Sequence, residues 1–153
     1  MGVWRKSFYR ARCTMLVKVF RMDKMELREL HRFFKGEEPI VVAYLFGSVA
    51  KGAVGGLSDV DVAVLLSKGY DLTLDYRLYL IDKLTEIIGK ETDVVMLNEV
   101  SPLLRYEVIK CGKVLYCRDE CERVAFEERT LDEYLDMGRI EKEYLRCLLQ
   151  KES

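Results

Sequence analysis

The run from Asp59 to Leu66 constrains the fold more than any other segment, because it is apolar on both faces except at two aspartates. A strand with one face in water alternates apolar and polar residues, whereas a continuous apolar run is typical of a sheet covered on both sides. Asp59 and Asp61 lie two residues apart, so their side chains emerge on the same face of the strand. The sequence thus predicts a covered sheet in which one strand begins with two adjacent carboxylates.

The remaining pattern predicts an α/β (α+β) fold, in which a small mixed sheet is flanked by helices and a C-terminal helical extension follows. Besides 59–66, strands are expected at 40–46, 92–97 and 114–116, where β-branched and aromatic residues gather. Helices are expected between them, with Asp71 or Thr73 and then Ser101 as N-caps. The helix that ends at Gly89 is expected to bury the apolar positions Leu74, Leu78, Ile81, Leu84 and Ile88.

The length of 153 residues fits one domain. We expect a basic N-terminal segment at 1–22, a central domain at 23–117 and a helical segment at 118–153 packed on that domain. Residues 1–21 hold six Lys or Arg and no acid. This segment is either an overlong start or an arm that contacts RNA or an acidic partner.

The net charge of −1 provides no overall attraction for nucleic acid, so any such contact is expected only through residues 1–21. No apolar stretch approaches the roughly 20 residues that a membrane span needs, which favours a cytoplasmic protein. The five cysteines form no zinc pattern and suit a reduced compartment. A disulfide between Cys111 and Cys117 stays open at this stage, as does a homo-oligomer.

The aspartate pair predicts a divalent metal site. Two carboxylates so close repel each other, and a bound Mg²⁺ relieves that repulsion with ligands of the type it prefers. A two-metal site needs a third carboxylate. Asp93 is the candidate, because it starts the strand predicted at 92–97, and a neighbouring strand can bring it alongside Asp59 and Asp61.

The glycine-rich segment before these aspartates predicts a phosphate-binding loop. Gly47 follows the strand 40–46 and lets the backbone approach a phosphate closely. Ser48 is expected to cap a short helix through Lys51, which would direct backbone N–H groups towards the anion. Lys51 either adds a positive charge there or is simply solvated.

Other phosphate-binding motifs are absent from this loop. The Lys-Ser/Thr pair of a P-loop is missing, since Ala53-Val54 stand in its place, and no G-x-G-x-x-G occurs. The alternative is a solvent-exposed hairpin with an Asp-x-Asp turn. Such a hairpin gives no reason for placing two carboxylates in an otherwise unbroken apolar strand.

The pattern Gly47-Ser48, ten residues, Asp59-x-Asp61 resembles the signature of the DNA polymerase β-like nucleotidyltransferase superfamily. More narrowly, it resembles the minimal nucleotidyltransferases of the MntA type, the antitoxins of HepT/MntA toxin–antitoxin pairs. The resemblance covers about residues 23 to 116 and implies the polymerase β-like fold.

The resemblance also implies roles for individual residues. Asp59, Asp61 and Asp93 would be catalytic ligands of two Mg²⁺ ions, and Gly47 and Ser48 would contact the nucleotide phosphates. ATP would be the donor, and AMP would pass to a tyrosine hydroxyl of a HepT-like toxin. Family members often carry Arg after the Gly-Ser pair, where this chain has Val49.

The expected reaction is attack of an acceptor hydroxyl on the α-phosphorus of ATP, with pyrophosphate leaving. Two alternatives stay open. The same fold can neutralise its partner by occlusion without turnover, or it can modify a small-molecule acceptor. The 153 residues leave little chain for a dedicated small-molecule pocket, which favours a protein acceptor.

Overall fold

The computed structural model describes residues 24–47 and 59–151. The basic segment 1–22 and most of the glycine-rich loop lie outside the described residues, so the expectations for Ser48 and Lys51 fall outside them too. Among the described helices, none is both long and apolar enough to cross a membrane. Cys111 and Cys117 are not joined by a disulfide.

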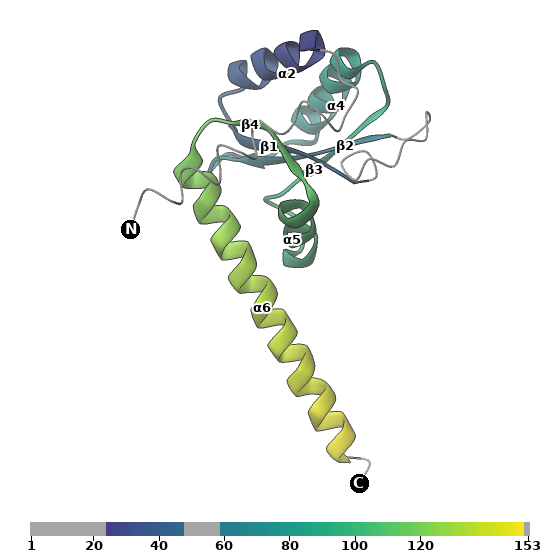
Figure 1. The fold of residues 1–153 in the computed structure, drawn as a ribbon, viewed down its shortest axis with the longest axis vertical. Coiled ribbons are helices and arrows are strands. Elements are labelled where there is room, and N and C mark those ends of the chain that lie inside the picture. The colour runs from purple at the N-terminus through teal and green to yellow at the C-terminus, as the bar shows by residue number, and fades with distance from the viewer. Residues whose placement is uncertain (1–23, 48–58, 152–153) are drawn as a thin grey trace.

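A four-stranded mixed sheet forms the centre of the molecule (Figure 1). Its strands are β1 (Ile40–Phe46), β2 (Val60–Leu66), β3 (Thr92–Met96) and β4 (Lys113–Cys117), in the order β3-β2-β1-β4. β1 pairs antiparallel with β2 and β4, while β2 and β3 are parallel. The predicted small mixed sheet is therefore confirmed, and the apolar strand with the aspartates lies in its interior.

Two helices cover each face of this sheet. α2 (Lys24–Gly36) and α4 (Leu74–Ile88) pack on one face, and α5 (Pro102–Cys111) and the start of α6 (Glu120–Lys151) pack on the other (Figure 1). Both faces of the sheet are thereby removed from water, as the continuous apolar strands predict.

Local signals set several helix ends as expected. The hydroxyl of Thr73 accepts a hydrogen bond from the amide of Tyr76 at the start of α4, and Ser101 caps α5 in the same way through Leu104. Gly89 ends α4 in a left-handed conformation with φ of 67°.

The face that α4 buries differs from the prediction. Leu80, Leu84 and Ile88 are buried against the sheet, whereas Leu74 and Leu78 are 71% and 50% exposed. The two exposed leucines lie on the flank of α4 that turns away from the sheet, so the predicted face is wrong at its N-terminal half.

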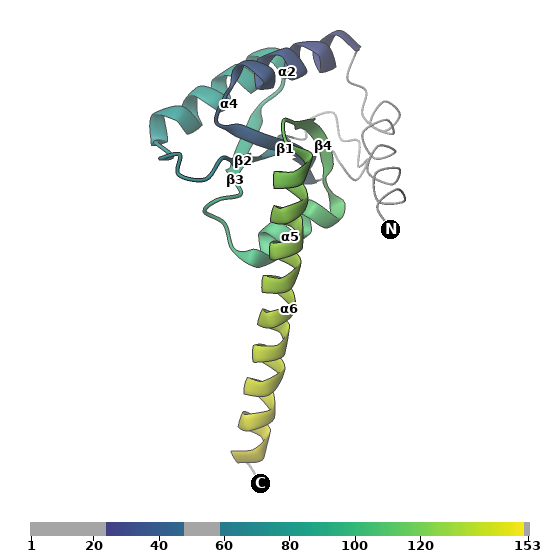
Figure 2. The ribbon, with the colours of Figure 1, turned by 90° about the vertical axis from the view of Figure 1, so that its left-hand side faces the viewer.

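The long helix α6 begins on the sheet and then leaves it (Figures 1 and 2). Phe126 and Thr130 are buried, and Tyr134 stacks on Tyr106 of α5 with ring centroids 3.9 Å apart. From residue 139 to 147 every described side chain is exposed. The expectation that all of 118–153 packs on the domain is therefore wrong for the second half, because the sheet and α5 end before the helix does.

Candidate functional site

The register of β2 and β3 brings two acidic residues together. Asp61 is the direct neighbour of Asp93 across the parallel pair, and Val60 is the neighbour of Thr92. The amide of Val60 donates a hydrogen bond of 2.9 Å to the carbonyl of Glu91, which fixes the start of this pairing. The prediction that a neighbouring strand brings Asp93 alongside is confirmed for Asp61.

The carboxylates lie on the sheet face that α5 and α6 cover. Side chains alternate along β2, and Ala63 and Leu65, which share the face of Asp61, belong to the core under these two helices. Asp59 precedes β2 by one residue and is exposed, as is Asp93, while Asp61 is half-buried. The three acids thus gather where β2 and β3 begin and β1 ends.

Gly47 lies directly against this cluster. Its φ of 77° is in the left-handed region, and a Cβ added to it would lie 2.1 Å from Oδ2 of Asp61. Phe46, the preceding residue, is the register partner of Asp61 across β1 and β2. Only glycine fits here, because any side chain would displace the carboxylate.

Burial and like charge both act on Asp61. Burial raises the pKa of its carboxyl group above the ordinary value, and the negative charges of Asp93 and Asp59 raise it further. No ion pair within the described part of the chain neutralises these three acids. The cluster therefore favours a cation.

The donor set suits Mg²⁺ in chemistry, since all three candidate ligands are carboxylates that share one face of the sheet. Within residues 24–47 and 59–151, no three acidic, histidine or cysteine side chains already converge closely enough to hold a metal. Asp59 and Asp93 are exposed, so their carboxylates have room to turn towards a metal.

A positioning contact at the start of β3 has no signal in the sequence. Thr92 is 3% exposed, and its hydroxyl donates to the carbonyl of Lys90 at 3.0 Å. The adjacent carboxylate of Asp93 accepts a hydrogen bond from the amide of Val94 at 3.0 Å. These contacts hold the strand start that carries Asp93, and a lone threonine in a short strand does not reveal them.

Comparison with known proteins gives consistent results. The family described as "Polymerase beta, Nucleotidyltransferase" matches residues 28–121. The protein adenylyltransferase MntA of Aphanizomenon flos-aquae is 33% identical over 131 residues, which cover 76% of this chain and 84% of that protein.

Two solved structures share the fold. A toxin–antitoxin crystal structure with AMP-PNP aligns with a TM-score of 0.65 at 24% identity, covering 84% of this chain and 99% of that one. A complex of the tri-AMPylated Shewanella oneidensis HEPN toxin with its MNT antitoxin aligns with a TM-score of 0.64 at 22% identity, with coverage of 84% and 99%.

The family match covers residues 28–121, which is more than half of the chain. This chain therefore belongs to the polymerase β nucleotidyltransferase family.

Proposed function

We propose that this protein is a Mg²⁺-dependent protein adenylyltransferase, which transfers AMP from ATP to a tyrosine hydroxyl of a HepT-like toxin and so acts as its antitoxin. The observation that carries the proposal is the register of Asp61 and Asp93 on adjacent parallel strands, with Gly47 against Asp61. That arrangement sets a carboxylate cluster, of the kind that holds the metal ions of phosphoryl-transfer enzymes, beside a glycine at the end of the preceding strand.

Each residue has a distinct proposed role. Asp59, Asp61 and Asp93 hold the metal ions, and the backbone of Gly47 leaves Asp61 free to face them. Ser48 and Lys51 are the proposed contacts of the nucleotide phosphates. When bound, Mg²⁺ supplies Lewis acidity, which makes an attacking hydroxyl more acidic and offsets charge on the leaving pyrophosphate.

The choice of donor and acceptor rests on relatives. The Aphanizomenon relative is a protein adenylyltransferase, and structures that share the fold hold AMP-PNP or an AMPylated toxin. We infer that the present chain uses ATP and a toxin of the same kind, in the cytoplasm, where ATP and Mg²⁺ are available.

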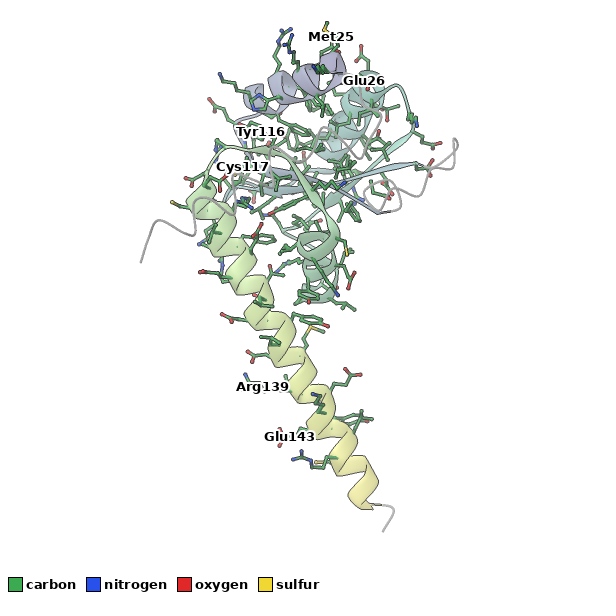
Figure 3. All side chains as sticks on the ribbon, in the orientation of Figure 1. Met25, Glu26, Tyr116, Cys117, Arg139 and Glu143 are labelled. Atoms are coloured by element: carbon green, nitrogen blue, oxygen red, sulfur yellow. The ribbon has the colours of Figure 1, made fainter. Side chains whose placement is uncertain are left out.

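Labelled ATP tests the proposal. The protein, incubated with α-labelled ATP, Mg²⁺ and a HepT-like partner encoded beside it, is expected to move label onto the partner. Asp59→Asn and Asp61→Asn are each expected to lower the rate by at least about 100-fold, because charge stabilisation at the phosphorus is lost. Glu143→Gln is the matched control, an equivalent change at an exposed carboxylate on the far part of α6 (Figure 3).

The alternatives give different results. A stable complex without label on the partner would identify a binder that acts by occlusion. Label on a small molecule, with none on the partner, would identify another acceptor. Full transfer by either Asn variant would contradict the metal-ligand assignment.

A further inference from the structure

From Leu131 onward, α6 carries an apolar face that the described residues leave largely open. Leu131, Leu135 and Leu145 are 45%, 55% and 51% exposed. With Tyr134 and Gly138 they follow spacings of three, four and seven residues, so all five lie on one side of the helix. We call these five residues the distal face.

The distal face continues a surface that is already used for packing. Phe126, Thr130 and Tyr134 follow one another every four residues and pack on the domain, and the next position in that row is Gly138. A hollow of about 940 Å³ lies beside this stretch, lined by residues of α6 from 132 to 142 and by Leu103 of α5. Leu103 is itself 50% exposed, so apolar surface borders the hollow from two helices.

Gly138 has no reason within the described chain to be glycine. A Cβ added there would meet no atom within 4 Å, and the residue lies inside a continuous helix. Glycine at such a position destabilises a helix relative to alanine. A small residue in the middle of an exposed apolar face is what a close crossing with another helix requires.

The charges on one flank of the distal face change sign along the helix. Asp132 comes before Gly138 on that flank, while Arg139, Lys142 and Arg146 come after it, and Glu141 lies on the other flank. Asp136 and Arg139 already pair within the helix. An antiparallel copy of this helix would bring Asp132 of one chain opposite the basic residues on the same flank of the other. A parallel copy would bring like charges together.

We propose that the distal face is a homodimer interface, in which the α6 helices of two copies cross antiparallel at Gly138. The surface is self-complementary in this one orientation, as a two-fold axis demands. The second helix fills the hollow beside Leu103, and Asp132 of each copy lies near Arg146 of the other. The two globular parts then stand at opposite ends of the paired helices, with both carboxylate sites outside the interface.

Sedimentation equilibrium of the full-length protein over a range of concentrations tests this interface. The wild type is expected to be a dimer that dissociates on dilution. Gly138→Leu and Leu145→Glu are expected to weaken association by at least about tenfold, without lowering the thermal midpoint of the dilute protein. Ile140→Glu is the matched control, since Ile140 is 69% exposed but lies two residues from Gly138 and so faces nearly the opposite way.

A charge swap tests the orientation. Asp132→Arg is expected to weaken the dimer, and the double variant Asp132→Arg with Arg146→Asp is expected to restore it. A monomer at every concentration would overturn the proposal, as would a dimer that these variants leave unchanged. A monomer that needs the distal face to bind the HepT-like partner would also overturn it and assign the surface to that partner.

Discussion

At the scale of single residues, Gly47 controls the position of the Asp61 carboxylate. Gly47→Ala is expected to reduce nucleotidyl transfer by at least about 100-fold, because the added methyl group occupies the place of Oδ2. The left-handed backbone adds about 1–2 kcal/mol of strain. Gly69→Ala is the control, since Gly69 has a φ of 81° with nothing within 4 Å of an added Cβ. Labelled transfer and thermal unfolding of both variants separate the effect of backbone strain from that of displacing the Asp61 carboxylate. An equal loss of transfer in both variants would refute the proposed role of Gly47.

Asp61 itself should make stability depend on pH. Its pKa is raised in the folded protein by burial and by Asp93 and Asp59, so the folded state holds a proton that the unfolded state has released. The stabilisation is complete below the ordinary pKa of 3.8 and is lost as the pH rises through the folded value. In EDTA at pH 7 to 8, Asp61→Asn should therefore melt at a higher temperature than wild type, and the gain should vanish at acid pH. Asp82→Asn, the same change at an exposed position of α4, is the control.

At the scale of elements, a buried ion pair within α6 is joined to the sheet by a tyrosine of β1. Arg123 is 2% exposed and donates to Glu127 at 3.0 Å, and the hydroxyl of Tyr44 on β1 donates to the same carboxylate at 2.9 Å. Glu127→Ala leaves the buried guanidinium without this partner, which should cost about 3 kcal/mol. Urea unfolding measures the loss. Glu86→Gln, which breaks an exposed pair with Lys83 at 2.8 Å, should leave the midpoint unchanged, and a similar loss in both variants would show that burial does not matter here.

Local sequence signals were enough to predict most helices and strands. Which individual side chains are buried could be seen only in the tertiary structure. The caps at Thr73 and Ser101 depend on neighbouring amides, so the sequence alone identifies them. Leu78 and Leu84 have the same side chain in one helix, yet only Leu84 is buried, because the sheet covers one flank of α4.

The candidate site likewise has features that the sequence predicts and features that only the structure shows. Asp59 and Asp61 share a face by their spacing, which is a local property of the chain. That Asp61 and Asp93 are direct neighbours on paired strands follows only from the strand order and the parallel register. The contact of Gly47 with Asp61 could not be predicted, because it joins separate strands through backbone geometry that spacing does not specify.

At the scale of the whole molecule, a globular α/β part continues into one projecting helix (Figure 2). Isolated helices shorter than roughly 12–15 residues are marginally stable in water, and the exposed stretch 139–147 has no packing to support it. Amides at 137–147 should therefore exchange hydrogen much faster than those at 120–134 in dilute protein, and raising the concentration should slow them as the distal faces pair. Hydrogen-exchange mass spectrometry reads both segments at once. Equal slow exchange in dilute protein would contradict the marginal stability of the projecting part.

The parallel pairing of β2 and β3 has a consequence for how the protein can be divided. Two parallel neighbours need a crossover, here α4, so Asp61 and Asp93 lie on opposite sides of that connection along the chain. A cut between Leu66 and Leu74 would leave the first two acids on one fragment and the third on the other. Neither fragment would carry the whole carboxylate cluster, so recovered transfer would report that the two pieces had reassembled.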